Sequence, residues 1–316
     1  MKKDQAYNRS LEGYADRVIA EAMLALDDDV GDGDVTTEAV VRGKPRTEDA
    51  VIIAKANGIL CGLQEAKAIL EDGGLSFESK KQEGEAIKKG EIIAKVHGNV
   101  KELLKRERTA LDYLQVLSGI ATATNRLARR NPGKVASLRK VHPGLCYSEK
   151  RAVKVGGGFT HRLGLHDGFL IKDNHLATIV RELYEDASIN EEKKIEAIRH
   201  ALRRTKQYRA NHRLDDCFIE VEVESLDQAV AAAKFHKAEG VPDMILLDNM
   251  TPDDVAKCIE AIRREAGSEI LIEASGGITS KNIGAYVEAG ADMISTSRMT
   301  LFATPLDISM KIIGYK

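Results

Sequence analysis

The sequence contains no tryptophan, and aromatic residues make up only 4% of its 316 positions. So few rings leave little surface on which unpaired nucleobases could stack. The formal net charge is −2, which argues against unspecific attraction to nucleic acid or to an anionic membrane. No run of about 18 apolar residues is present, so no membrane span is expected. These absences predict a globular protein whose partners are neither nucleic acid nor membrane.

Cysteine is also scarce, and the four cysteines (Cys61, Cys146, Cys217 and Cys258) form no C-x-x-C pair. Isolated cysteines of this kind are typical of reduced structural thiols in a cytoplasmic protein. The opening residues, MKKDQAYNRSLEGYADRV, lack the apolar core of a secretory signal. We therefore expect a cytoplasmic location.

The first third of the chain combines amphipathic helices with short strands. Apolar residues recur at helical spacing in 14–26 and again in 99–131. Between these helices lie short apolar runs that glycines interrupt, a pattern typical of a small sheet. The runs occupy residues 49–63 and 80–98. We predict a first domain over residues 1–116, in which a sheet packs on helices and to which residues 297–316 return.

From Lys134 onward, strand-like apolar runs alternate with helical segments. The runs are mostly unbroken, which indicates parallel strands buried on both faces. The predicted strands are 135–139, 169–172, 218–223, 244–248, 270–274 and 293–296, and the predicted helices include 186–206, 225–239, 252–266 and 280–289. Six such units within about 165 residues fit an α/β barrel. We predict this barrel over residues 117–296, with a charged helical insertion near 176–216.

Polar side chains follow each of the six predicted strands. Barrel enzymes build their sites at the carboxyl ends of the strands, so these side chains should converge. Burying charge without function costs several kcal/mol per ion; six polar ends therefore predict a functional site. The residues at these ends are Arg139-Lys140, Lys172-Asp173, Glu222 with Glu224, Asp248-Asn249, Glu273 with Ser275, and Ser295 with Ser297.

Three groups among these and neighbouring residues suit a small polyanion. A cationic group would bind carboxylates or phosphates, the arginines through paired hydrogen bonds. It consists of Arg139, Lys140, His161, Arg162 and Lys172. Glu222 and Asp248 could share Mg²⁺ or face a developing positive charge. The Ser275-Gly276-Gly277 turn offers backbone N–H groups to a phosphate.

Two other interpretations of the same residues stay open at this point. Lys172, at the end of a barrel strand, could act as the nucleophile of a Schiff-base lyase. A regulatory barrel that binds an anion without turning it over would need the same cationic group.

Several of these residues lie in longer motifs. The motifs are GDGDVTT, ERTALDYLQVLSGIAT, RKVHPGL, GGGFTHRLGLHDGFLIKDNH, EVEVESLDQA, ILLDNM and EASGGIT. In them the chain resembles the quinolinate phosphoribosyltransferase family, the decarboxylating nicotinate-nucleotide pyrophosphorylases. The resemblance implies an N-terminal α/β sandwich domain, a C-terminal α/β barrel and a homodimer. In that dimer the sandwich of one subunit covers the barrel mouth of the other; a higher oligomer stays open.

The resemblance also implies an activity, in which phosphoribosyl pyrophosphate and quinolinate give nicotinate mononucleotide, pyrophosphate and CO₂ for NAD biosynthesis. Mg²⁺ would be the cofactor, held by Glu222 and Asp248. The implied catalytic residues are Lys140, Lys172, Glu222 and Asp248. The implied substrate ligands are Arg139, His161 and Arg162, with Arg108 of the ERT motif reaching across the dimer interface. The implied phosphate ligands are Ser275, Gly276, Gly277, Ser297 and Arg298.

Three places depart from the family pattern. Leu138 stands where the family usually has threonine, and Thr160 replaces a usual asparagine. In the segment 296–302, Ser297 and Arg298 occupy positions where the family tends to have a glycine-alanine turn. These changes leave the exact aromatic acid open and admit a ModD-like paralogue that acts on a different acid.

Overall fold

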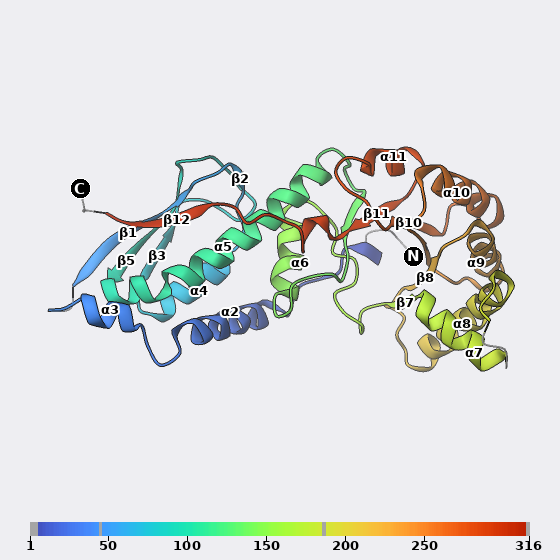
Figure 1. Cartoon of the computed structure of the whole chain (residues 1–316), viewed down its shortest axis with the longest axis horizontal. Coiled ribbons are helices and arrows are strands. Elements are labelled where there is room, and N and C mark those ends of the chain that lie inside the picture. The colour runs from blue at the N-terminus through green and yellow to red at the C-terminus, as the bar shows by residue number, and fades with distance from the viewer. Residues whose placement is uncertain (1–5, 44–45, 185–187, 314–316) are drawn as a thin grey trace. The chain divides into compact units, whose positions relative to one another are not determined.

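The computed structural model describes residues 6–43, 46–184 and 188–313. These residues form two compact units, each with sheets of its own (Figure 1). The barrel unit comprises the residues up to Arg9, 130–139 and 159–296; the sandwich unit comprises 10–129, 140–158 and the residues from Ser297 onward. Relative to the predicted domains of 1–116 and 117–296, the first residues group with the barrel. Two segments beyond residue 116 group with the sandwich.

The barrel unit holds six parallel strands in one sheet, in the order β6-β11-β10-β9-β8-β7. The strands are β6 (Val135–Ser137), β7 (Phe169–Ile171), β8 (Ile219–Val223), β9 (Met244–Asp248), β10 (Leu271–Ser275) and β11 (Met293–Thr296). Most of their side chains are buried, as unbroken apolar runs require. The predicted fold class, with about six parallel strands, is confirmed.

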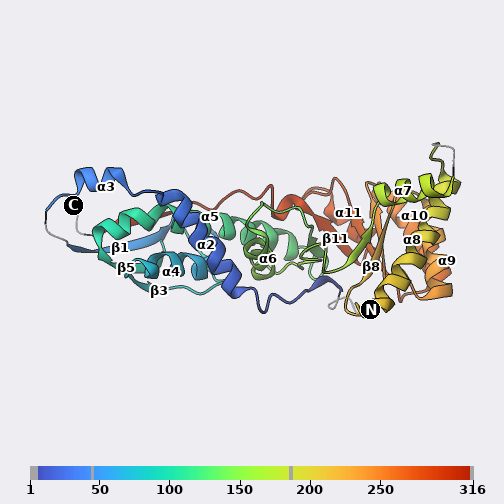
Figure 2. The ribbon, with the colours of Figure 1, turned by 90° about the horizontal axis from the view of Figure 1, so that it is seen from below.

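Helices connect these strands and cover the sheet. They are α7 (Asp173–Leu183), α8 (Glu191–Asn211), α9 (Leu226–Glu239), α10 (Pro252–Ala266) and α11 (Ile283–Glu288). Helices α8, α9 and α10 lie side by side (Figure 2). The predicted helix 186–206 is displaced to the bounds of α8, and its residues 186 and 187 lie outside the described residues. The charged insertion is therefore largely α7 and α8, and α8 buries Ala197, Ile198, Ala201 and Leu202 along one face.

The first described residues extend the edge of the sheet beyond β6. The N–H of Phe159 donates to the carbonyl of Val135 at 2.9 Å, so this residue pairs with β6. His161 in turn pairs with Asn8. We call residues 6–9 the N-terminal arm. Its Ala6 and Tyr7 are fully buried. They share one hydrophobic cluster with Ala136, Phe218, Met244 and Met293.

The sandwich unit is built on an antiparallel sheet of order β12-β1-β5-β3. These strands are β1 (Thr47–Ala54), β3 (Ser76–Ser79), β5 (Ile92–Asn99) and β12 (Ile308–Ile312), and β2 (Gly58–Ile59) pairs separately with β4 (Ala86–Ile87). The helices are α2 (Ala15–Val30), α3 (Val35–Val40), α4 (Leu63–Asp72), α5 (Val100–Ala128) and α6 (Cys146–Val155), followed by the 3₁₀ turn η1 (Ser297–Met299). Helices α4 and α5 pack together on the sheet (Figure 1). Pairing of β12 with β1 confirms the predicted return of the C-terminal tail.

Two local features of this unit differ from the sequence prediction. The spacing of Asn99 and Glu102 at the start of α5 predicts a capping box. Asn99 does cap the helix, its side chain accepting from the N–H of Lys101, but Glu102 pairs with Lys105 and Arg106 and does not complete the box. Helix α6 was not predicted, because its middle carries Glu149, Lys150 and Arg151 and reads as solvated. The structure buries Glu149 and Lys150.

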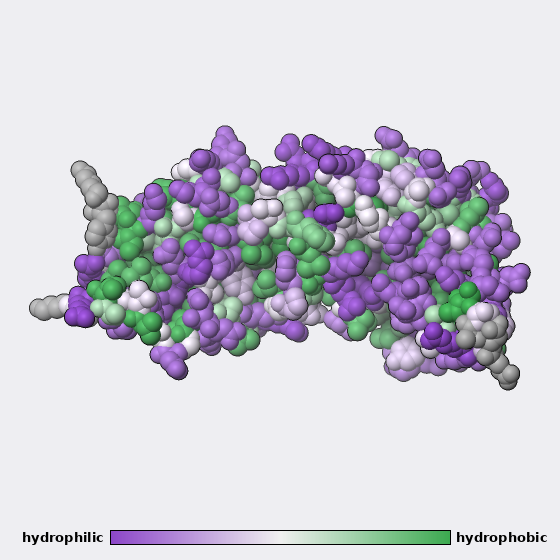
Figure 3. Space-filling view, viewed as in Figure 1, coloured by the Kyte–Doolittle hydropathy of each residue, from purple (hydrophilic) through white to green (hydrophobic). Residues whose placement is uncertain are grey.

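Among the described residues, no helix is both long enough and apolar enough to cross a membrane. On the face of the molecule in Figure 3, hydrophilic side chains dominate and apolar ones are interspersed. Apolar side chains of α3, such as Val35 and Val40, are exposed. All four cysteines are described, and none forms a disulfide.

Candidate active site

The strand ends of the barrel unit bring several predicted residues together. In the sheet register, Ser275 of β10 lies beside Asp248 of β9, and Val223 of β8 lies beside Leu247. Lys172 directly follows β7, and its Nζ lies 3.6 Å from Oε2 of Glu222 on β8. The carboxyl ends of the strands therefore bring together four of the predicted residues: Lys172, Glu222, Asp248 and Ser275.

The two acids at the carboxyl ends of these strands, Glu222 and Asp248, lie close enough for the charge on Asp248 to affect the pKa of Glu222. Partial burial raises the pKa of Glu222, the charge on Lys172 lowers it, and the charges on Asp248 and Asp173 raise it further. The side-chain amide of Asn249 donates to Oδ2 of Asp248 at 2.6 Å and orients this carboxylate. Such a pair of carboxylates can stabilise a developing cation or supply oxygen ligands to Mg²⁺.

Arg162 is only 5% exposed, and its Nη1 donates to the carbonyl of Gly168 at 3.1 Å. Burial lowers the pKa of Arg162, Glu220 raises it, and the charge on the exposed Arg139 lowers it. The two arginines are therefore close enough to repel, so an anion that lies between them relieves both.

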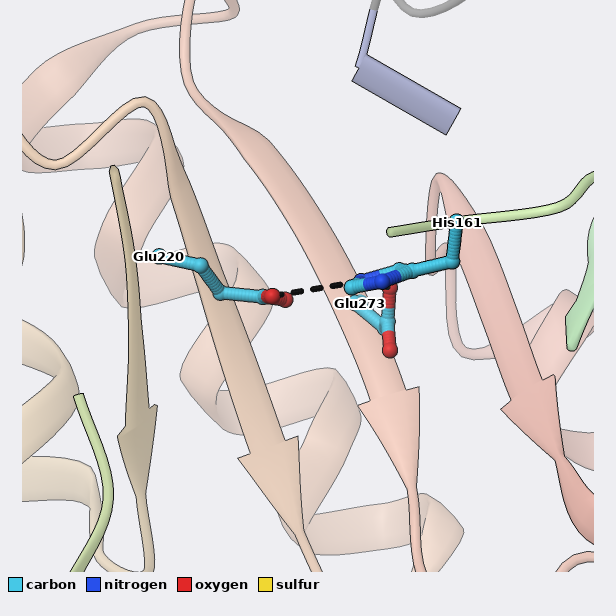
Figure 4. Close-up of side chains that lie close together, drawn as sticks. All are labelled: His161, Glu220 and Glu273. Carbon is cyan, nitrogen blue, oxygen red and sulfur yellow. Dashed lines mark ion pairs between the residues drawn. The ribbon is translucent and has the colours of Figure 1, made fainter. Parts of the chain in front are cut away.

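His161, which the family resemblance assigns to the substrate, is 2% exposed. Its Nε2 lies 3.2 Å from Oε2 of Glu220 and 3.3 Å from Oε2 of Glu273 (Figure 4). Figure 4 shows these two carboxylates reaching the ring from β8 and β10. The substrate contact of His161 stays a prediction. We call these three buried residues the barrel trio.

The barrel trio holds one more proton than separate groups would at neutral pH. Burial disfavours charge on the ring, but the two carboxylates outweigh it and raise the pKa of His161 to about 9. Burial and the charge on Glu273 raise the pKa of Glu220 as well. Because Nδ1 of His161 accepts the backbone N–H of Arg162 at 2.7 Å, a ring proton sits at Nε2. The extra proton of the trio then lies on Glu220, whose pKa is raised, and the trio keeps a net charge of −1.

Among the described residues, the barrel trio is also the one group of three side chains whose potential metal ligand atoms lie within 4.8 Å of one another. Metal binding through Nε2 would require the proton to sit on Nδ1. Nδ1 already accepts a hydrogen bond there. The trio therefore suits a shared proton better than a metal ion.

The Ser275-Gly276-Gly277 turn requires its glycines. Both have positive φ angles, 90° for Gly276 and 62° for Gly277, which side chains rarely adopt. A Cβ on Gly276 would also overlap Asn249, whose own N–H donates to the carbonyl of Ser275 at 3.0 Å. The following helix α11 begins only at Ile283 and is a six-residue helix. Any phosphate contact thus depends on the turn itself.

Four predicted site residues belong to the sandwich unit instead: Arg108, Lys140, Ser297 and Arg298. Arg108, on α5, pairs with Asp112 at 3.0 Å, and both side chains are more than half exposed. The carbonyl of Lys140 accepts from the hydroxyl of Thr300 at 2.7 Å. The guanidinium of Arg298 lies over the ring of Phe302, 4.8 Å from its centre.

Two features of the site were missed by sequence reasoning. Glu220 received no role, although it stands two residues before Glu222 on a strand and must therefore face the same side. That alternation was a usable signal. The N-terminal arm gave no signal, because Tyr7 and Asn8 are ordinary residues whose pairing with His161 spans about half of the chain.

Comparison with known proteins agrees with this architecture. The model of the quinolinate phosphoribosyl transferase N-terminal domain matches residues 34–118, and that of its C-terminal domain matches residues 120–311. A probable nicotinate-nucleotide pyrophosphorylase (carboxylating) of Methanothermobacter thermautotrophicus is 36% identical over 295 residues, covering 91% of this chain and 96% of that protein. The probable enzyme of the same name from Bacillus subtilis is 36% identical, covering 90% of each chain.

Solved structures agree as well. The crystal structure of NadC from Streptococcus pyogenes superposes with a TM-score of 0.76 at 32% sequence identity, covering 93% of this chain and 96% of that one. A NadC deletion mutant superposes with a TM-score of 0.80 at 31% identity, covering 96% and 98%.

Proposed function

The chain belongs to the quinolinate phosphoribosyltransferase family, and we propose that it catalyses that family's decarboxylating transfer. Quinolinate and phosphoribosyl pyrophosphate would give nicotinate mononucleotide, pyrophosphate and CO₂ in NAD biosynthesis. The observation that carries the proposal is the shared strand edge at which Lys172 faces Glu222 beside Asp248 and the Ser275 turn. Relatives of about one-third identity across nearly the whole chain support it.

Quinolinate has two carboxylates, and the cations of the barrel unit suit them. Arg162 and Arg139 lie close together at the barrel, and their guanidinium groups can each form two parallel hydrogen bonds with a carboxylate. Lys172, which is 43% exposed, adds a point charge that can follow the substrate. We assign Arg139, Arg162 and Lys172 to the dicarboxylate, and a substrate contact of the buried His161 stays a prediction.

Glu222 and Asp248 would act at the sugar. The pyridine nitrogen attacks the anomeric carbon while pyrophosphate leaves, and the sugar passes through a cationic, oxocarbenium-like state. Two fixed carboxylates stabilise this charge best when little water competes. The 2-carboxylate then departs as CO₂, since the new pyridinium nitrogen accepts the electron pair. Lys172 and Lys140 would stabilise the resulting carbanion and direct a proton to it.

Mg²⁺ fits this carboxylate pair. Both side chains offer oxygen, the ligand type that Mg²⁺ prefers, and their charges lie close enough for Asp248 to raise the pKa of Glu222. Glu222 and Asp248 would hold the ion, which when bound would neutralise charge on the departing pyrophosphate. The Ser275, Gly276 and Gly277 turn would receive the 5′-phosphate, and Ser297 and Arg298 would add to the phosphate site.

We further propose a homodimer in the cytoplasm, in which Arg108 of one subunit completes the site of the other. Arg108 and Asp112 form a solvent-exposed ion pair between residues one helix turn apart. Pairs of this kind contribute well under about 1 kcal/mol, so a substrate carboxylate can displace Asp112 easily. Four cysteines without a disulfide suit a reducing compartment.

A panel of acids tests the proposal. The purified protein, with phosphoribosyl pyrophosphate and Mg²⁺, should release pyrophosphate and CO₂ from quinolinate. Nicotinate and other pyridine carboxylates serve as the comparison, because Leu138 and the 296–302 segment depart from the family pattern. Release with another acid alone would favour a ModD-like paralogue. Binding of quinolinate without release of either product would favour the non-catalytic barrel, and borohydride trapping of a carbonyl substrate on Lys172 would favour the lyase.

A further inference from the structure

The fully buried Thr160 joins the N-terminal arm to the turn that carries Arg162. Its Oγ1 donates to the carbonyl of Tyr7 at 3.1 Å and accepts the N–H of Arg9 at 2.9 Å. One hydroxyl thus satisfies two backbone groups of the arm. Valine has almost the same shape but removes both of these hydrogen bonds, each of which makes a modest net contribution to stability.

The side chain of Arg9 forms a second link to the same turn. Its Nε lies 2.7 Å from Oδ1 of Asp167, while Oδ2 of Asp167 accepts the N–H of Leu163 at 2.8 Å. Both Arg9 and Asp167 are largely buried, where charge-assisted hydrogen bonds are strong. Arg9 also donates to the carbonyl of Asp216 at 3.1 Å. The arm therefore holds the turn on both sides of Arg162.

Between these two links the backbone is strained. His161 has a φ of 50°, in the left-handed region that residues other than glycine seldom adopt. Such conformations persist only where the surroundings fix them. The N–H of His161 donates to the carbonyl of Tyr7 at 2.8 Å, so the arm supplies a bond to the strained residue itself.

We propose that the N-terminal arm is a positioning element of the active site. By fixing the turn at His161, it sets the guanidinium of Arg162 for the substrate dicarboxylate. This inference rests on the proposed function, since that function assigns Arg162 to quinolinate. It gives Thr160, which departs from the family pattern, a role in holding the turn without touching the acid.

Three variants of the full chain test the arm. Thr160→Val removes both hydroxyl bonds, Thr160→Ser keeps them, and Thr178→Val removes a surface hydroxyl that donates only within α7. Thr160→Val should raise KM for quinolinate roughly tenfold, the effect of one or two hydrogen bonds, and leave KM for phosphoribosyl pyrophosphate nearly unchanged. Thr160→Ser and Thr178→Val should match the original protein. An unchanged quinolinate KM in Thr160→Val, or an equal rise in both KM values, would overturn the proposal.

Amide hydrogen exchange separates this inference from the proposed function, because it needs no substrate. The amides of His161 and Leu163 should exchange at least tenfold faster in Thr160→Val and in Arg9→Ala, and not in Thr178→Val. Arg9→Ala also serves as the kinetic variant if Thr160→Val does not fold. If the original protein does not turn over quinolinate, the proposed function fails, while exchange still decides whether the arm holds the turn. Unchanged protection of these amides in Thr160→Val and in Arg9→Ala would contradict the proposed role of the N-terminal arm.

Discussion

Nζ of Lys172 lies 3.6 Å from Oε2 of Glu222, with the lysine following one strand and the glutamate near the end of the next. The ammonium group of Lys172 suits a carboxylate of the substrate. The carboxylate of Glu222 suits the positive charge that develops on the sugar. Burial raises the pKa of Glu222, and the charge on Lys172 lowers it, so the lysine opposes the shift toward the neutral acid. The residue proposed to bind quinolinate therefore contacts the residue proposed to act at the sugar.

Glu222→Gln tests the role of the carboxylate. It keeps the shape of the side chain but removes the charge that faces the developing cation, so kcat should fall roughly 10²- to 10³-fold. KM for quinolinate should change little, and stability should hold because Lys172 is partly exposed. Steady-state kinetics with both substrates measure this. Glu224→Gln, which alters an exposed acid paired with Lys194, is the control; equal losses in both variants would argue against the assignment.

Gly276→Ala tests the phosphate turn. The added methyl group would overlap Asn249, and the residue would have to keep a φ of 90°. We expect KM for phosphoribosyl pyrophosphate to rise at least roughly tenfold, because the methyl group cannot be accommodated unless Asn249 or the turn itself shifts. Gly277→Ala is the matched control, since nothing lies within 4 Å of its Cβ position. It should cause a clearly smaller rise, and the reverse order would contradict the account of the turn.

The barrel trio predicts a pH dependence of stability. The pKa of His161 is raised to about 9 from an ordinary value of 6.5. Its contribution is fully present below pH 6.5 and is lost as the pH rises toward 9. That loss amounts to roughly 3 kcal/mol if the whole shift is realised. Tyr7 and Arg162 also face the trio, but Tyr7 stays neutral because burial raises its pKa further.

Urea unfolding followed by circular dichroism measures this at pH 6 and pH 9. Glu220→Gln should flatten the dependence, because the glutamine replaces a carboxyl group that shares the extra proton. Glu273→Gln provides the second arm of the comparison. The same pH slope in the original protein and in Glu220→Gln would show that the trio holds no extra proton.

Mixing of inactive subunits tests the shared site. Arg108→Ala and Lys172→Ala should each abolish turnover without unfolding the protein, since both side chains are substantially exposed. In a two-fold dimer, random mixing makes half of the dimers mixed, each with one intact site, so about a quarter of the activity should return. If mixed subunits exchange and no activity returns, Arg108 does not act across an interface.

Much of the fold was predictable because parallel strands that are buried on both faces leave an unmistakable apolar run. The bounds of β9 (Met244–Asp248) match the predicted strand, and those of α10 (Pro252–Ala266) match the predicted helix. Helix α8 was displaced in the prediction because its inner face is formed by small residues such as Ala197 and Ala201 among many charges. The helical periodicity of apolar residues in α8 is therefore weak.

The site was predictable where it lies at strand ends and not where it depends on distant pairing. Glu222 and Asp248 follow from strand ends alone. The partners of His161 do not, because Glu220 and Glu273 come from two different strands of the sheet and are far from His161 in the sequence. The N-terminal arm is a further case, in which backbone pairing across more than 150 positions leaves no local pattern.

One measurement tests the central claim most directly, namely product release by the purified protein with phosphoribosyl pyrophosphate, Mg²⁺ and carboxyl-labelled quinolinate. We predict equal amounts of CO₂ and pyrophosphate, with nicotinate mononucleotide as the third product, and no release from Glu222→Gln above about one-hundredth of that rate. Absence of both products from quinolinate, under conditions in which the protein is folded and binds its substrates, would contradict the account.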